Sequence, residues 1–155
     1  TLNSCTPKTE GKTQHQGSTL LVKDLDGNGA VDCLLGDVSF ANATAVYNTG
    51  TSFNADMTSQ DSTFPKLDIP VDLYLFPAFF DLDVNNDGEN DIIVAPNING
   101  SKNTENTWLY ENMGTPSSPN YQRTSTGFLQ EDMLDFGEGS KPTFVDLNTD
   151  GKKIW

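Results

Sequence analysis

Residues 83–91 read Asp-Val-Asn-Asn-Asp-Gly-Glu-Asn-Asp. Counted from Asp83, oxygen-bearing side chains occupy positions 1, 3, 5 and 9, and a glycine occupies position 6. A hard cation such as Ca²⁺ takes six to eight oxygen ligands at about 2.3–2.6 Å, from carboxylates, amides and backbone carbonyls. A glycine at position 6 lets a short loop turn sharply around such an ion, because it has no Cβ to clash. The stretch therefore predicts a calcium-binding loop.

The same pattern occurs three times, with starts at residues 24, 83 and 146, which are 59 and 63 residues apart. Position 7 is expected to add its backbone carbonyl to the ligand set. We expect two Ca²⁺ sites, in the first and second loops, because the third loop has Ile154 where the pattern has an aspartate. The predicted ligands are Asp24, Asp26, Asn28, Ala30 and Asp32 in the first loop, Asp83, Asn85, Asp87, Glu89 and Asp91 in the second, and Asp146, Asn148 and Asp150 in the third.

The pattern opens like an EF-hand loop but does not continue as one. An EF-hand needs a glutamate at position 12 and a helix on each side. Position 12 is Leu35 in the first loop and Val94 in the second. The residues after position 9, 33–35 and 92–94, are short apolar runs that predict buried strands. A calcium turn between two strands fits these residues better than a helical one.

Composition and charge narrow the class of protein. The 155 residues are 35 % apolar, below the globular average of about 45–50 %, which also counts glycine, and turn-forming residues are abundant. The net charge of −13 argues against a nucleic-acid partner, since phosphate binding needs basic patches. No apolar run approaches the roughly 20 residues needed to cross a bilayer, so no membrane insertion is expected. Cys5 and Cys33 could pair in an oxidising compartment or stay free thiols.

Strands are expected at residues 18–23, 32–38, 43–47, 92–95 and 107–110, with long polar surface connections at 51–70 and 116–140. The blocks around the second loop recur in the third, and the ends of the 43–47 and 107–110 strands also match. We therefore divide the chain into an entry segment (1–17), repeats at 18–70 and 71–140, and the start of a third repeat at 141–155. Small sheets that repeat in this way predict an all-β fold of β-propeller blades, with about two and a half repeats of some 60 residues in a larger propeller.

At residues 24–36, 79–94 and 144–151, the chain resembles the FG-GAP/VCBS repeat family, the calcium-loop blades of integrin α-subunit propellers and of many secreted bacterial proteins. The flanking residues 15–19, 35–39 and 76–78 look like surface proteins of Bacteroidetes that carry such repeats. The resemblance implies a propeller, a structural Ca²⁺ in each loop, and an extracellular or cell-surface location. It also implies further blades, from the same or another chain.

These observations lead to a non-enzymatic segment for adhesion or protein–protein interaction. The alternative is a carbohydrate-binding, lectin-like module or an accessory domain of a secreted polysaccharide-degrading enzyme. The partner is then a protein or a glycan at a surface. No catalytic residues are predicted, although Asp81 and Asp83 have the spacing of a strand-borne acid/base pair. Asp81 is alternatively a further carboxylate beside the second loop.

Overall fold

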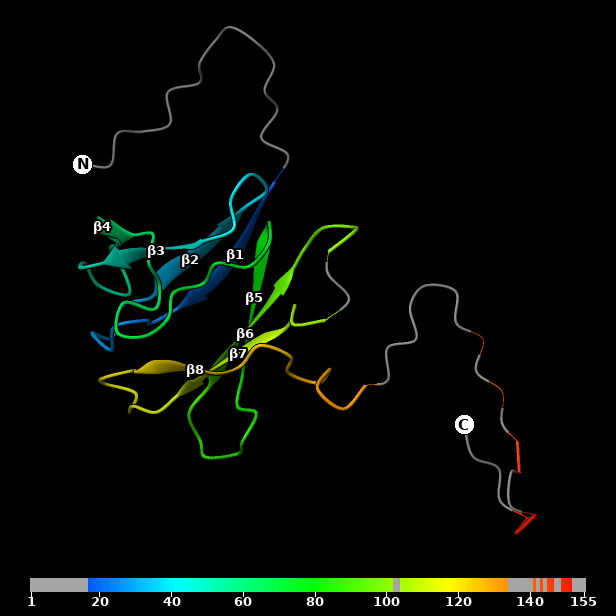
Figure 1. Ribbon diagram of the computed structural model, residues 1–155. Helices are drawn as coiled ribbons and strands as arrows, with labels where there is room; N and C mark the ends of the chain where they lie inside the picture. Colours follow the sequence, from blue (N-terminus) through cyan, green and yellow to red (C-terminus); the bar gives the residue numbers. More distant parts are fainter. Residues whose placement is uncertain are drawn as a thin grey trace, which may run out of the picture.

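The computed structural model describes residues 17–101 and 104–133, together with 141, 143, 145, 146 and 149–151. Within these residues the chain is all-β, as the sequence predicts, and contains no helix. The strands form two four-stranded antiparallel sheets, ordered β1-β2-β3-β4 (the first sheet) and β5-β6-β7-β8 (the second sheet) (Figure 1). The strands are β1 (Ser18–Lys23), β2 (Asp32–Asp37), β3 (Ala43–Asn48), β4 (Met57–Asp61), β5 (Pro77–Leu82), β6 (Asp91–Pro96), β7 (Trp108–Asn112) and β8 (Tyr121–Ser125).

Each sheet begins with a hairpin whose turn is one of the acidic loops. Lys23 pairs with Asp32 where β1 and β2 meet the first loop, and Leu82 pairs with Asp91 where β5 and β6 meet the second. Both loops therefore connect two antiparallel strands, and the rejection of an EF-hand is confirmed for them.

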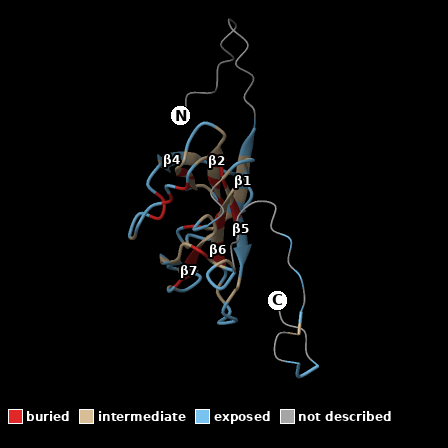
Figure 2. Cartoon of the chain, turned by 45° about the vertical axis from the view of Figure 1, so that its right-hand side comes forward, coloured by how far each residue is buried: buried red, intermediate tan, exposed pale blue. Residues whose placement is uncertain are grey.

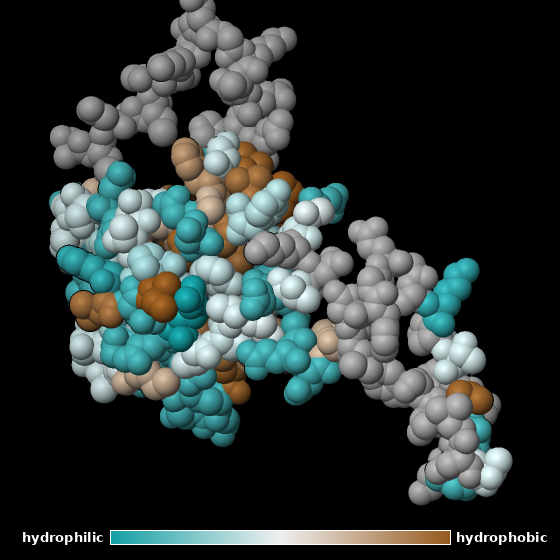
Figure 3. Space-filling view, viewed as in Figure 1, coloured by the Kyte–Doolittle hydropathy of each residue, from teal (hydrophilic) through white to brown (hydrophobic). Residues whose placement is uncertain are grey.

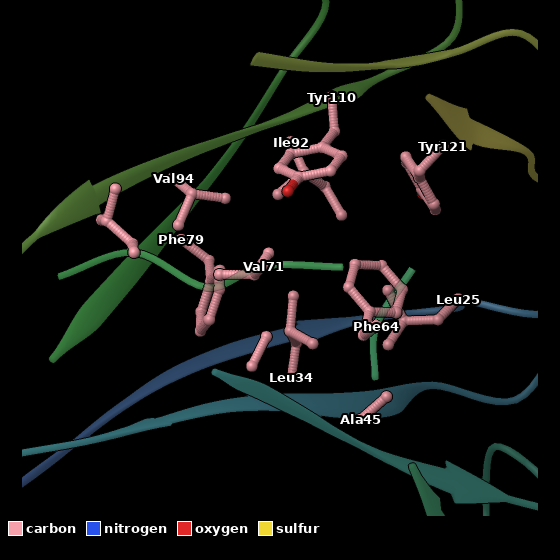
Figure 4. Close-up of a cluster of buried hydrophobic side chains, with 12 residues drawn as sticks. Leu25, Leu34, Ala45, Phe64, Val71, Phe79, Ile92, Val94, Tyr110 and Tyr121 are labelled. Carbon is pink, nitrogen blue, oxygen red and sulfur yellow. The ribbon is translucent and has the colours of Figure 1, made fainter. Parts of the chain in front are cut away.

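The hydrophobic core lies between the two sheets. Leu34 and Ala45 of the first sheet, and Ile92, Val94 and Tyr110 of the second, are all fully buried there. Figure 4 shows these side chains projecting from the two sheets toward one another. Full burial of an aliphatic or aromatic side chain contributes about 1.5–3 kcal/mol, so this shared layer is the main term that holds the sheets together.

The segment between the sheets contributes to the core, contrary to the prediction that residues 51–70 are a surface connection. Phe64 is only 3 % exposed, and its ring lies 5.7 Å from the ring of Tyr121. Val71, just beyond the predicted connection, is also buried, and Figure 4 shows both side chains in the space between the sheets. Part of the prediction holds, because Phe53 is fully exposed.

Two strands lie inside the predicted polar connections. β4 (Met57–Asp61) lies within residues 51–70, and β8 (Tyr121–Ser125) lies within 116–140. Each is the last strand of its sheet and pairs on one side only. The side chains of β4 are half-buried or exposed, so its sequence lacks the apolar alternation by which half-buried strands are recognised. Buried residues, red in Figure 2, occur on each of the inner strands β2, β3, β6 and β7.

The two sheets contact each other through non-equivalent faces. Asp32 and Asp91 end the first and second loops and begin β2 and β6. Two residues later, Leu34 is fully buried in the core, whereas its counterpart Ile93 is only half-buried and has the opposite orientation. In the second sheet it is Ile92, one residue after the aspartate, that points into the core.

The first strands of the two sheets show the same reversal. Leu20 and Phe79 are counterparts, three residues before the end of β1 and of β5. Leu20 is 58 % exposed, whereas Phe79 is 8 % exposed and belongs to the core. At the next residue of each strand the burial is the other way round, because Leu21 of the first sheet packs against the core and its counterpart Phe80 is 54 % exposed. The first sheet therefore presents one face to the core, and the second sheet presents the other.

β1 and β5 lie beside each other where the two sheets meet (Figure 1, Figure 2). The Thr19 hydroxyl donates a hydrogen bond to the carbonyl of Pro77. Lys23 forms an ion pair with Asp81, and its Nζ also donates to the carbonyl of Asn90 at 3.1 Å. These contacts join residues 58 or more positions apart and fix how the first sheet sits on the second.

None of the described residues belongs to a helix that is long and apolar enough to span a bilayer.

Candidate metal-binding loops

The three acidic loops share one backbone geometry at their centres. In each, an oxygen of the aspartate at position 1 accepts a hydrogen bond from the N–H of the glycine at position 6, at 2.8, 3.0 and 2.8 Å. That glycine has a φ of 87°, 96° or 83°, which an L-residue rarely adopts. Position 4 also has positive φ in all three loops. The position-1 and position-6 pairs are Asp24–Gly29, Asp83–Gly88 and Asp146–Gly151.

The side chains at positions 3 and 5 turn back onto the loop backbone. Asp26 Oδ1 accepts from the N–H of Asn28 at 3.1 Å, and Asn28 Oδ1 accepts from the N–H of Ala30 at 2.7 Å. In the second loop, Asn85 and Asp87 accept from the N–H two residues later at 2.9 and 2.8 Å. Both loops thus curl with these oxygens on the inside, and position 7 takes part through its N–H.

The aspartate at position 9 has a separate role, which the sequence did not predict. Asp32 is fully buried, and its two oxygens accept from the N–H groups of Leu25, at 2.8 Å, and Asn48, at 2.7 Å. It therefore ties the second residue of the loop to the end of β3. In the second sheet, Asp91 is also fully buried and makes the matching bonds to the N–H groups of Val84 and Asn112, at 3.0 and 2.8 Å.

The first loop gathers carboxylates most closely. One oxygen each from Asp24, Asp26 and Asp32 lies within 4.8 Å of the others, and among the described residues these are the three acidic side chains that come so close. Burial raises the pKa of Asp32 above its usual value, and the charges of Asp26 and Asp24 raise it further, although its backbone hydrogen bonds oppose the shift. Three carboxylates in such proximity repel one another, and a divalent cation would relieve that repulsion.

The third loop is described in part. Asp146 accepts from the N–H of Asp150 at 3.2 Å, as Asp83 does from the N–H of Asp87. The predicted ligand Asn148, as well as Ile154 and Cys5, lies outside the described residues. Cys33 is a free thiol among the described residues.

Asp81 is engaged in contacts other than the second loop's own backbone bonds. It pairs with Lys23, and its other oxygen accepts from the side-chain amide of Asn90 at 3.0 Å. This carboxylate thus serves the junction of the two sheets, while Asp83 holds the loop backbone through the N–H groups of Asp87 and Gly88. The count that starts the second loop at Asp83 agrees with the geometry of the other two loops.

An asparagine behind each of the first two loops is a structural residue that the sequence reading missed. Asn48 and Asn112 end β3 and β7, and both are almost fully buried. The Oδ1 of Asn48 accepts from the N–H groups of Gly50 and Asp56 at 3.0 and 2.8 Å, and Asn112 makes the matching pair of bonds in the second sheet. The signal was visible as the matching Asn-x-Gly-Thr ends at residues 48–51 and 112–115.

The first loop also contacts the second sheet. Gly27, at position 4 with a φ of 79°, lies against the backbone of Ser117 in the turn between β7 and β8, and a Cβ built on it would come within 2.4 Å of the Ser117 carbonyl carbon. The other two loops have Asn86 and Thr149 at this position. Only a glycine fits here, both because of its positive φ and because of the neighbouring turn.

Comparison with known proteins gave no match to a family model, a curated protein or a solved structure.

Proposed function

We propose that the chain is a calcium-stabilised, non-enzymatic segment of a β-propeller that serves adhesion or protein–protein interaction in a secreted or cell-surface protein. The observation that carries the proposal is the geometry shared by three loops, in which the position-1 aspartate accepts from the N–H of a positive-φ glycine at position 6. The extracellular setting and the adhesive role rest on the family resemblance.

The residues of the first two loops fit a hard cation. Carboxylate and amide oxygens line the inside of each loop, and each oxygen that already accepts one backbone N–H keeps a second lone pair. Asp24, Asp26, Asn28, Ala30 and Asp32 would hold the ion in the first loop. The residues of the second would be Asp83, Asn85, Asp87, Glu89 and Asp91. The ion would neutralise clustered charge and add its binding free energy to folding.

The non-equivalent faces of the two sheets support propeller blades. If a two-fold rotation axis related the two similar sheets, both would present the same face to the core, as in an isologous contact. Here the first sheet contributes Leu34 to the core and the second sheet contributes Ile92, and these are not counterparts. A rotation that carries one sheet onto the next, repeated around an axis, is the arrangement of blades in a propeller.

Calcium binding is tested by titration calorimetry and by thermal unfolding in Ca²⁺ and in EDTA. At a free Ca²⁺ concentration 100 times the Kd, one site adds about 2.7 kcal/mol. For a domain of this size, about 2–4 °C of Tm accompanies each kcal/mol, so chelation should lower the Tm by roughly 5–10 °C for each occupied site. Asp87→Ala should reproduce part of this loss, and Asp56→Ala, which changes an exposed aspartate outside the loops, should not. Equal Tm values and no binding heat would contradict the proposal.

A cavity favours the second candidate function, carbohydrate binding. It has a volume of about 160 Å³ and lies where β6 ends and β7 begins. Aromatic residues with a few polar groups are the usual lining of a small-molecule site. The cavity is lined by Asp72, Leu73, Tyr74, Pro96, Glu105, Asn106 and Trp108.

A glycan array followed by titration of tryptophan fluorescence tests this candidate. A saccharide that binds in this cavity should quench the fluorescence of Trp108, and Trp108→Ala should abolish binding while a Tyr47→Phe control retains it. Failure to bind any glycan on the array would leave the adhesion function as the sole candidate.

A further inference from the structure

Both sheets carry apolar side chains on the face that is turned away from the core. On the second sheet, Phe80 and Leu82 are 54 % and 55 % exposed. On the first sheet, Leu20 and Val22 are 58 % and 53 % exposed. Figure 3 shows hydrophobic residues as brown areas among hydrophilic ones on the side in view. Apolar residues on both faces are typical of sheets that are covered on both sides.

We define these two surfaces by the residues that their strand register places together. The outer face of the first sheet consists of Leu20, Val22, Cys33, Leu35 and Val46. The outer face of the second sheet consists of Ala78, Phe80, Leu82, Ile93 and Ala95, together with Leu109, which pairs with Ile93 and is only 4 % exposed.

The two outer faces correspond, residue by residue, to the two faces that already pack in the core. Phe80 and Ile93 are the counterparts of Leu21 and Leu34, which the first sheet presents to the second. In the same way, the outer face of the first sheet corresponds to the core face of the second. The molecule therefore exposes both halves of a contact that it also makes internally.

One pair of positions shows that the outer faces are adapted to each other. In the internal contact, Lys23 of β1 pairs with Asp81 of β5. Their counterparts are Leu82 of β5 and Val22 of β1, both exposed. The two positions that carry a charged pair in the contact between the sheets thus carry two apolar residues on the outer faces. Had only one of the two positions changed, a charge would have faced an apolar side chain, which is unfavourable without a partner.

At one position the outer face of the second sheet allows a less close approach than the core face of the first sheet does. The backbone of β5 runs so near Gly36 that a Cβ there would lie 2.0 Å from the Pro77 carbonyl oxygen. The counterpart of Gly36 on the outer face is Ala95, which is small but has that Cβ. A sheet on the outer face must therefore sit slightly farther away than the first sheet sits on the second.

We propose that the outer face of the second sheet binds the outer face of the first sheet of a second copy of this chain, head to tail. Because each copy carries one of each face, the contact is heterologous and leads to a ring or an open chain of copies rather than to a two-fold dimer. The net charge of −13 opposes association, so the contact strengthens as salt screens it. The proposal rests on the equivalence of the two sheets, which belongs to the proposed function, but not on calcium.

Sedimentation velocity over a concentration series, in salt and with either Ca²⁺ or EDTA, tests the proposal. The chain should form species larger than a dimer. Phe80→Glu removes one face and Val22→Glu removes the other, so each variant alone should sediment as a monomer. Mixed together, the two variants each retain one complementary face and should form a 1:1 dimer and nothing larger. The matched control is Phe53→Glu, at a fully exposed phenylalanine outside both faces, which should assemble like the parent chain.

Each result decides the matter. A monomer at all concentrations overturns the proposal, as does assembly that persists in both single variants. A mixture that stays monomeric points to a contact other than head to tail and overturns it as well. Circular dichroism spectra and Tm values equal to those of the parent show that a variant is folded, and Leu82→Lys replaces Phe80→Glu if that variant is not. Assembly in EDTA with no Tm shift on chelation would retain this inference while contradicting the calcium proposal.

Discussion

Replacing Asp32 by asparagine separates the structural role of the position-9 aspartate from any role in binding metal. Each of its oxygens accepts one buried backbone N–H, from Leu25 and from Asn48. An asparagine keeps one acceptor and places an NH₂ donor against the other N–H. The loss of a hydrogen bond to a charged group costs about 1.5–3 kcal/mol, and an unpaired buried donor adds about 1–3 kcal/mol.

Part of this cost is offset, because burial and two neighbouring aspartates already disfavour the charged form and raise the pKa of Asp32. We therefore expect Asp32→Asn to lower the free energy of unfolding by about 3 kcal/mol, a large share of the roughly 5–15 kcal/mol that holds a domain together. Urea denaturation in EDTA measures this loss without metal. The control is Asp26→Asn, an exposed residue of the same loop, which should stay within about 0.5 kcal/mol of the parent in EDTA.

In Ca²⁺, both variants should lose the stabilisation that the metal gives the first loop. A loss below about 1 kcal/mol for Asp32→Asn in EDTA would refute the reasoning, because it would mean that the two backbone bonds contribute no more than an average surface contact. A loss in EDTA with full metal stabilisation retained would instead show that Asp32 is structural and not a ligand.

Three further predictions follow from the packing. Phe64→Ala should lower the free energy of unfolding by about 3–5 kcal/mol, measured by urea denaturation, because it leaves a cavity between the sheets. Phe53→Ala, at a fully exposed site, should change it very little. Equal effects of the two substitutions would contradict the core described above. Gly27→Ala should destabilise the protein more than Gly29→Ala. Both substitutions cost about 1–2 kcal/mol because the backbone has positive φ, but only at Gly27 would the added Cβ also clash with the turn between β7 and β8. The reverse order of Tm values would show that the loop does not touch that turn. Burial raises the pKa of Tyr110 from 10.0 to about 12. The stability that the neutral, buried phenol contributes is therefore complete below pH 10 and is lost as the pH rises through 12. A urea midpoint that does not fall over this range would contradict the burial of Tyr110.

The sequence predicts the acidic loops and most of the strands well, for local reasons. Position 6 needs a glycine whichever sheet it belongs to, and Leu20, Leu21 and Val22 form an apolar run beside a turn, so both signals lie within a few residues. The role of Asp32 could not be predicted in this way, because one of its hydrogen-bond partners lies 16 residues away. Its position in the motif indicated a ligand but not a link between the loop and β3.

The last strand of each sheet escapes prediction for a related reason. β4 carries Thr58, Ser59 and Gln60 at its centre, and as an outermost strand it needs no apolar face. Phe64 carries no local mark of burial either, because it is buried by the second sheet, which follows later in the chain. Apolar anchors in long connections are therefore better candidates for the core of a two-sheet protein than the polarity of their neighbours suggests.

The contact of Gly27 with Ser117 gives the first loop a mechanical consequence that the second loop need not share. An ion bound in the first loop would stiffen a loop that packs against the turn between β7 and β8. The occupancy of that metal site would therefore affect how rigidly the first sheet is held against the second. Loss of such an ion would weaken the contact between the first loop and the turn between β7 and β8.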